Sequence, residues 1–173
     1  MNLKRDLPMN QIMLRTLALI FVFLAFAAPA HSFERRGRLG VGFSNQLMID
    51  VPAVSFKIQR SRSFAFGGIL GVSTDSNDGG VGAGVKLYKI LFDEPQLNFY
   101  SSFLGAYIKD KNGTSADVSG FQFDLTLGSE FSFVGLQSLG FSIDFGVSLN
   151  KLDDFVVETT AGGLVVAAVH FYL

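Results

Sequence analysis

The sequence predicts an all-β fold: an eight-stranded antiparallel up-and-down transmembrane β-barrel that follows a cleaved N-terminal signal peptide. Three observations lead to this prediction: an apolar export-type segment near the N-terminus, a period-two alternation of apolar and polar residues afterwards, and a composition with 19 Gly and 19 Phe. Glycine is unfavourable inside helices, whereas phenylalanine and valine suit a pleated surface. The composition therefore favours strands over helices.

The overall composition excludes several classes of protein. The chain has 173 residues, of which 49% are hydrophobic, and its net charge is −1. This is a one-domain length, and the balance is too apolar for a disordered chain and too neutral for a nucleic-acid-binding protein. The chain has no cysteine, which excludes a disulfide framework and any thiolate metal or redox centre. No metal or cofactor is predicted.

The N-terminal segment has the pattern of an export signal. Basic residues precede an apolar run at Leu17–Ala28, and small residues follow at Ala30 and Ser32, so cleavage is expected after one of these two. An uncleaved membrane helix is the weaker alternative, because a span needs about 20 apolar residues. Residues 1–32 are therefore predicted as a signal peptide and residues 33–173 as an outer-membrane β-barrel.

The remainder of the chain reads as strands because apolar and polar residues alternate between clusters of turn residues. The predicted strands, in chain order, are Arg38–Leu47, Val54–Arg60, Phe64–Thr74, Val81–Leu91, Leu97–Ile108, Phe121–Phe133, Leu139–Leu149 and Thr160–Leu173. In each of the first four strands, Leu, Val, Ile and Phe lie on one face, and Gly, Ser, Gln and Lys lie on the other. The fifth is apolar on both faces, so its orientation is not predicted.

The sixth and seventh predicted strands give the clearest faces. The sixth and seventh each place five or six Phe, Leu, Ile or Val residues opposite Gly, Ser, Thr, Gln, Asp and Glu. Such a face has the length of about 9 to 11 residues that a tilted strand needs to cross hydrocarbon. The eighth puts Val169, Phe171 and Leu173 on one parity and His170 on the other.

Alternation fits two kinds of barrel, because a soluble barrel hides its apolar face inside and a membrane barrel exposes it to lipid. Here the polar face is mostly Gly, Ser, Thr, Asn and Gln with isolated charges, which suits a narrow lumen, whereas a solvated surface would carry many Lys and Glu. An even number of strands also closes without an edge in lipid. The membrane barrel is favoured, and a soluble periplasmic lipocalin-like ligand-binding barrel is the alternative.

The C-terminal strand carries a resemblance to a known family. Val165, Ala167, Val169, Phe171 and Leu173 resemble the last strand of bacterial outer-membrane barrels, although that family's pattern ends in an aromatic residue. In size and strand number the chain is similar to the small barrels of the OmpA transmembrane domain, OmpX and OmpW type. The resemblance implies a bacterial outer-membrane location, contact with outer-membrane lipid and lipopolysaccharide, the barrel-assembly machinery as a partner during biogenesis, a monomer, and no nucleic-acid partner.

The same resemblance implies that both termini are periplasmic, which sorts the connections. The predicted outer loops are Met48–Ala53, Asp75–Gly80, Lys109–Ser119 and Asn150–Glu158, and the predicted inner turns are Ser61–Ser63, Phe92–Gln96 and Val134–Ser138. Aspartates gather in the outer loops, where they could attract divalent cations that bridge to lipopolysaccharide. Solvated loop tips are the favoured interpretation, because no spacing there matches a calcium loop.

Catalysis is not predicted. His170 is followed by Phe171 and Tyr172, so the His-x-Ser arrangement of lipid A deacylase barrels is absent. The parity of His170 points it into the lumen, where a hydrogen bond to a neighbouring residue is expected. A barrel enzyme that modifies lipid A is kept as an alternative function.

The candidate functional site is a set of charges on the polar parity, namely Lys57, Lys86, Asp124, Glu130 and Asp144. Charges in a narrow interior must be paired, because an unpaired buried charge is strongly destabilising. Lys86 is predicted to neutralise Asp144 and Glu130, with Lys57 as the second cation. A static plug is favoured over a gate. The predicted role is structural, in surface interaction, or in minor porin-like passage of small solutes.

Overall fold

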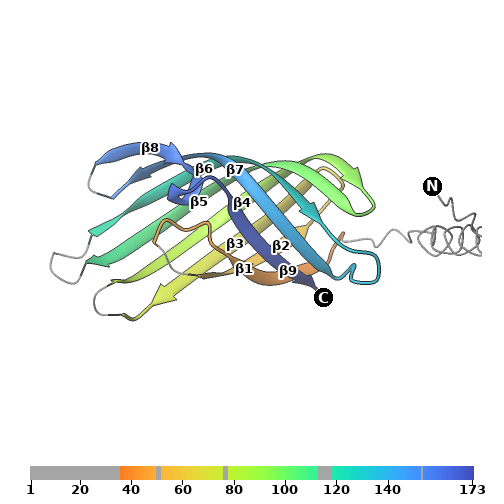
Figure 1. Ribbon diagram of the computed structural model, residues 1–173, viewed down its shortest axis with the longest axis horizontal. Helices are drawn as coiled ribbons and strands as arrows, with labels where there is room; N and C mark the ends of the chain where they lie inside the picture. Colours follow the sequence, from red (N-terminus) through yellow and green to blue (C-terminus); the bar gives the residue numbers. More distant parts are fainter. Residues whose placement is uncertain (1–35, 50–51, 76–77, 113–117, 153) are drawn as a thin grey trace, which may run out of the picture. The chain divides into compact units, whose positions relative to one another are not determined.

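The computed structural model describes residues 36–49, 52–75, 78–112, 118–152 and 154–173; the predicted signal peptide and its cleavage site lie outside them. Nine strands and one 3-10 helix occur in these residues (Figure 1). They are β1 (Leu39–Ser44), β2 (Ala53–Gln59), β3 (Phe64–Ser73), β4 (Asp78–Glu94), β5 (Leu97–Asn112), β6 (Val118–Phe131), β7 (Leu139–Lys151), β8 (Phe155–Thr159), η1 (Thr160–Gly162) and β9 (Val166–Tyr172).

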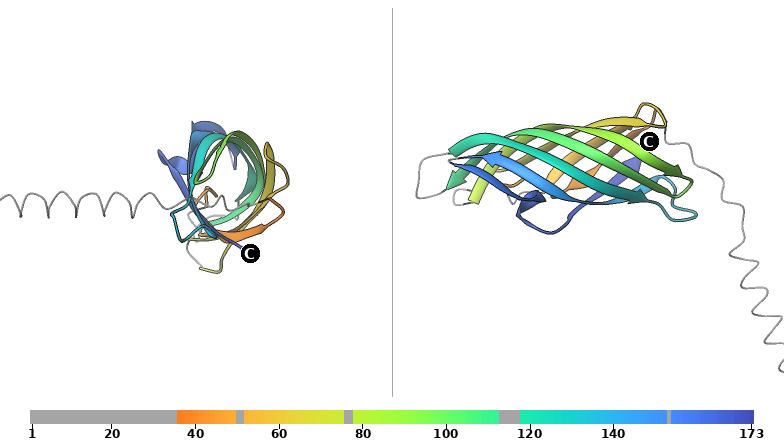
Figure 2. Two further views of the ribbon diagram at one scale, coloured as in Figure 1. Left: turned by 90° about the vertical axis from the view of Figure 1, so that its right-hand side faces the viewer. Right: turned by 90° about the horizontal axis from the view of Figure 1, so that it is seen from above.

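The strands form a closed antiparallel barrel. Each strand from β1 to β7 pairs with its neighbour in the chain, and β9 pairs with both β7 and β1. Seen from its end, the sheet makes a complete ring (Figure 2). The prediction of a closed eight-stranded antiparallel barrel is therefore confirmed for the described residues. No helix in this part of the chain is long and apolar enough to cross a membrane.

The sequence predicted a single eighth strand at Thr160–Leu173. In the structure two shorter strands, β8 and β9, take its place beside β7. β9 pairs with Leu139–Asp144 of β7, and β8 pairs with Val147–Lys151 farther along the same strand. Between the Asp144↔Val166 and Val147↔Thr159 pairs, β7 advances three residues and its partner seven. Gly162, at φ 63°, supplies the left-handed turn that accommodates the extra residues.

The predicted faces are confirmed in the strands. On β6, for example, Phe121, Phe123 and Leu125 are exposed, whereas Gln122 and Asp124 are buried. The same alternation turns Phe, Leu and Val outward on the other barrel strands. A lipocalin-like barrel needs the opposite arrangement, with its large apolar side chains inside around a ligand. The orientation of the described strands contradicts that alternative.

The segment that follows β1 enters the barrel instead of forming the predicted outer loop at Met48–Ala53. We call residues 45–49 the plug segment. Its Leu47 and Ile49 are buried, and they belong to one hydrophobic cluster with Leu104 and Ile108 on the inward face of β5. This packing also explains why β5 is apolar on both faces: one face is outward and the other covers the plug segment.

A glycine on β4 makes room for the plug segment. A Cβ atom at Gly82 would lie 2.8 Å from Cδ1 of Leu47 and 3.1 Å from Cδ1 of Ile49. Because real side chains do not approach so closely, only glycine leaves space here without rearrangement. Beside Gly82, apolar side chains of the plug segment and of β5 therefore occupy part of the lumen.

Candidate functional site: the lumen charge network

The structure places all five residues of the candidate site inside the barrel. They come from four strands, β2, β4, β6 and β7, and each occupies an inward position of its strand. Their exposed fractions are Lys57 2%, Lys86 8%, Asp124 1%, Glu130 0% and Asp144 2%. We call these five residues the lumen network.

The first ion pair of the lumen network joins β2 to β6. Nζ of Lys57 lies 2.5 Å from Oε2 of Glu130, and the Tyr172 hydroxyl donates to the other carboxylate oxygen at 2.7 Å. The Lys57 ammonium also lies 4.5 Å from the ring centre of Tyr88 and 4.7 Å from that of Tyr100. Cation–π contacts of this kind stabilise a desolvated ammonium.

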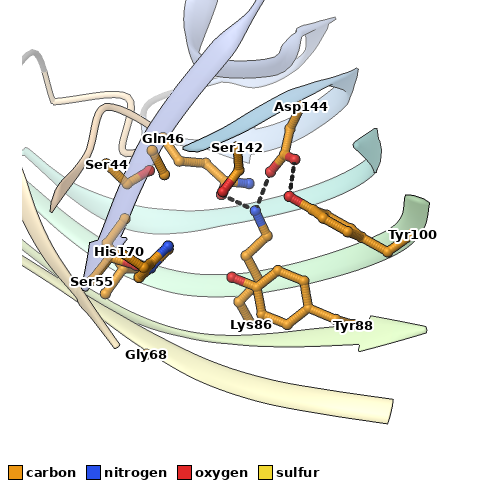
Figure 3. A pocket seen from close by; sticks show the side chains of 12 residues that line it. Ser44, Gln46, Ser55, Gly68, Lys86, Tyr88, Tyr100, Ser142, Asp144 and His170 are labelled. Atoms are coloured by element: carbon orange, nitrogen blue, oxygen red, sulfur yellow. Dashed lines mark hydrogen bonds and ion pairs between the residues drawn. The ribbon is translucent and has the colours of Figure 1, made fainter. Parts of the chain in front are cut away.

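The second ion pair joins β4 to β7. Lys86 forms an ion pair with Asp144, and the Tyr100 hydroxyl donates to Oδ1 of Asp144 at 2.5 Å. The Lys86 ammonium also donates to Oε1 of Gln46 at 2.6 Å (Figure 3). Each of these four buried charges thus has an opposite charge and a further polar or aromatic partner, which is what a low-dielectric interior requires.

Asp124 differs from the other two carboxylates because its partners are neutral. Its oxygens accept hydrogen bonds from the side-chain amides of Gln46, at 2.9 Å, and Gln122, and from the Ser148 hydroxyl at 2.6 Å. Within the described residues no Lys or Arg nitrogen lies within ion-pair distance of it. The lumen network, with two lysines and three carboxylates, therefore carries one formal negative charge in excess.

The pairing differs from the prediction that Lys86 neutralises both Asp144 and Glu130. The predicted register of Glu130 opposite Ser142 is confirmed, yet each acid has its own lysine. The two lysines lie on different strands of the barrel wall, so each meets a different acid across the lumen. Lys57 on β2 contacts Glu130, and Lys86 on β4 contacts Asp144. Strand parity predicts which side chains share the lumen, but not which of them meet across it.

Sequence reasoning missed the role of Gln46. Its amide contacts both Lys86 and Asp124, and its backbone carbonyl accepts a hydrogen bond from the Gln122 amide at 2.9 Å. The Met48 N–H donates to Oε1 of Gln122 at 3.1 Å. These contacts fix the plug segment to the lumen network. The sequence places Gln46 on the polar face of the predicted strand Arg38–Leu47. In the structure β1 ends at Ser44, so Gln46 belongs to the plug segment and not to the barrel wall.

His170 forms the hydrogen bond to a lumen neighbour that its parity predicts. Its Nε2 lies 2.9 Å from Oγ of Ser55, and both residues are buried. Among the described residues, Nδ1 of His170 has no hydrogen-bond partner, so this pair lacks the orienting carboxylate of a Ser-His-acid triad. Ser55 and His170 line a cavity of about 10 Å³ (Figure 3).

The size of this cavity limits what can bind beside Ser55 and His170 in the observed conformation. A volume near 10 Å³ is about that of one water molecule, so an acyl chain or a sugar does not fit beside Ser55 and His170.

No group of three or more His, Asp or Glu residues with metal-binding geometry occurs in the described part of the chain. No known protein family, curated protein or solved structure matches this chain.

Proposed function

We propose that this chain is a bacterial outer-membrane β-barrel protein whose lumen is closed by its own side chains. Its role is structural or in surface interaction, without catalysis. The observation that carries the proposal is the inversion of the usual arrangement: large apolar side chains cover the outside of the barrel, and paired charges fill the inside. Water solvates such an apolar outer surface poorly, whereas the hydrocarbon of a lipid bilayer solvates it well.

The height of the apolar surface supports embedding in a bilayer. The outward positions of β6 run from Phe121 to Phe131, which at about 3.3 Å per residue and a tilt of about 40° spans roughly 25 Å, the height of a lipid-facing band. Aromatic pairs stand at both ends of this span. Tyr107 contacts Phe121 at 5.6 Å between ring centres, and Phe131 contacts Phe141 at 5.7 Å. Such girdles mark membrane interfaces.

Passage of small solutes is the second candidate function, and one observation favours it. The plug segment is a connection between strands, held by hydrogen bonds from Gln46 and Met48, and such a segment can move without breaking the barrel wall. In the observed conformation, however, the cavity that Gln46, Lys86 and Asp144 line has a volume of only about 10 Å³. We therefore propose a closed barrel as the resting state.

Cell fractionation tests the proposed location. The full chain, with its N-terminal segment, is expressed in Gram-negative cells, and inner and outer membranes are separated on a density gradient. We expect the protein in the outer-membrane fraction, extractable by detergent but not by salt. Recovery of monodisperse protein from the periplasm without detergent would overturn the proposal.

A further inference from the structure

Three exposed basic residues gather at the end of the barrel that holds the C-terminus: Arg60, Arg62 and Lys89. We propose that this inner basic cluster binds the phosphate headgroups of anionic phospholipids. The inference rests on the proposed membrane location and adds a partner to it. Short turns lie at the periplasmic end of such barrels, so the leaflet concerned is the inner one.

Backbone contacts hold the three residues in adjacent segments. The turn between β2 and β3 is closed by the Arg60 N–H, which donates to the Phe64 carbonyl at 3.1 Å. The Ile90 N–H donates to the Ser63 carbonyl at 3.0 Å, which fixes the turn beside β4. Lys89 on β4 lies opposite Phe64. Because Phe64 of β3 lies between Arg60 and Lys89, the backbones of these two residues are about two strand spacings, or roughly 10 Å, apart, and Arg62 lies in the turn at the same end of the barrel.

The inner basic cluster has no internal counter-charge. Among the residues that the structure describes, no carboxylate lies within ion-pair distance of Arg60, Arg62 or Lys89. The nearest acids along β4 are Asp93 and Glu94, four and five residues beyond Lys89 toward the same end of the strand, which is about 13 Å or more along the strand. Three like charges in one patch repel one another, so an anion placed among them relieves the repulsion.

The surroundings favour a lipid anion over a soluble one. Lys89 faces outward between apolar residues: Leu87 precedes it on the same face, and Phe64, which is 40% exposed, lies opposite. Its other cross-strand neighbour is Ser101, a hydroxyl that can donate to a phosphate oxygen. A lysine on a lipid-facing surface extends its ammonium to the headgroup level, and arginine binds phosphate through two parallel hydrogen bonds.

The barrel provides a matched control at its opposite end. Lys151 on β7 is also exposed and outward, and it lies between Phe121 and Phe155. It lacks neighbouring basic residues in register, so it offers one charge where the inner basic cluster offers three. Exposed lysine by itself is therefore not expected to select anionic lipid.

Native mass spectrometry of the protein in neutral detergent tests the inference. Dioleoyl phosphatidylglycerol or dioleoyl phosphatidylcholine is titrated in, and the bound lipid is counted. We expect preferential binding of phosphatidylglycerol, and a loss of about fivefold in its affinity for each charge removed by Arg60→Gln, Arg62→Gln and Lys89→Gln. Phosphatidylcholine binding should not change, and Lys151→Gln should leave both affinities as in the wild type.

Equal phosphatidylglycerol binding by the triple variant and the wild type would overturn the inference. Displacement of the bound lipid by an equal concentration of inorganic phosphate would also overturn it, because the site would then recognise free phosphate. If the triple variant does not fold, Arg62→Gln alone, in the exposed turn, gives the same comparison. Insertion into neutral phosphatidylcholine vesicles is scored separately: its failure contradicts the proposed membrane location, whereas unchanged lipid selectivity contradicts this inference alone.

Discussion

At the scale of single residues, the lumen network shows how a narrow barrel accommodates charge. Lys57 and Lys86 each have a carboxylate of their own, and a tyrosine hydroxyl donates to the second oxygen of each carboxylate. Breaking a buried pair by removing one partner leaves an uncompensated charge, which costs more than the pair itself contributes. The network therefore acts on stability as a unit.

Lys86→Met should lower the free energy of unfolding by about 3 to 5 kcal/mol, because it leaves Asp144 charged and unpaired in the lumen. Adding Asp144→Asn should restore part of the loss, since the remaining group is neutral. Urea unfolding of the barrel in detergent micelles measures both variants. Lys151→Met, at an exposed position, is the control. Equal stability of Lys86→Met and that control would mean that Lys86 does not stabilise the fold.

All five members of the lumen network were predicted from strand parity alone, because a period of two assigns each side chain to a face. Their partners were not. Gln46 belongs to a segment that leaves the wall, and Tyr100 lies on the strand whose two faces were both apolar. Contacts across a lumen also depend on strand tilt and stagger, which alternation does not encode.

At the scale of elements, the outward face of each strand is the part that lipid would contact. Phe145 lies midway along β7 and is exposed. Phe145→Arg should therefore cost about 2 to 4 kcal/mol in a vesicle-embedded barrel, because arginine is unfavourable in hydrocarbon near the bilayer centre. The control is Asn112→Arg at the end of β5. Unfolding midpoints in phosphatidylcholine vesicles that fall equally for both variants would contradict the outward orientation.

The plug segment makes a separate prediction for β4. Gly82→Val places methyl groups where Leu47 and Ile49 now lie, so the plug segment must shift, at a cost of about 1 to 3 kcal/mol. Gly105→Val is the matched control, because a Cβ there would meet its nearest neighbour, Phe123, at 3.6 Å on the outer face. We expect faster proteolysis near the plug segment in Gly82→Val only. Identical digestion patterns would argue against displacement.

Element boundaries were predicted less well than faces, for a physical reason. The strands β4 and β5 extend beyond their predicted ends because Asp, Lys and Asn residues taken as loop continue the ladder as far as Asp78 opposite Asn112. Conversely, β8 lies in a segment predicted as loop, and η1 interrupts the predicted last strand. Polar composition distinguishes solvated from buried residues, but a strand that projects beyond the apolar band is both polar and hydrogen-bonded.

At the scale of the whole molecule, we propose that the closed ring and the side chains inside it form a barrel that does not conduct ions in its resting state. We expect wild-type protein in planar bilayers to show little ion conductance. If the lumen network is a static plug, Lys86→Met should reduce stability and leave conductance low. If it is a gate, the same substitution should raise conductance, because the ammonium that fixes Gln46 of the plug segment has been removed. Conductance of the variant decides between the two roles.

We propose that this chain forms a closed β-barrel whose apolar outer surface is embedded in lipid, and refolding into vesicles tests this proposal directly. Residues 33–173 are diluted from urea into phosphatidylcholine vesicles and analysed on a denaturing gel with and without boiling. A closed, embedded barrel resists the detergent until heated, so the unboiled sample should migrate as a distinct compact band and the boiled one as the unfolded chain. Identical mobility of the two samples, together with monodisperse protein left in vesicle-free buffer, would contradict the account.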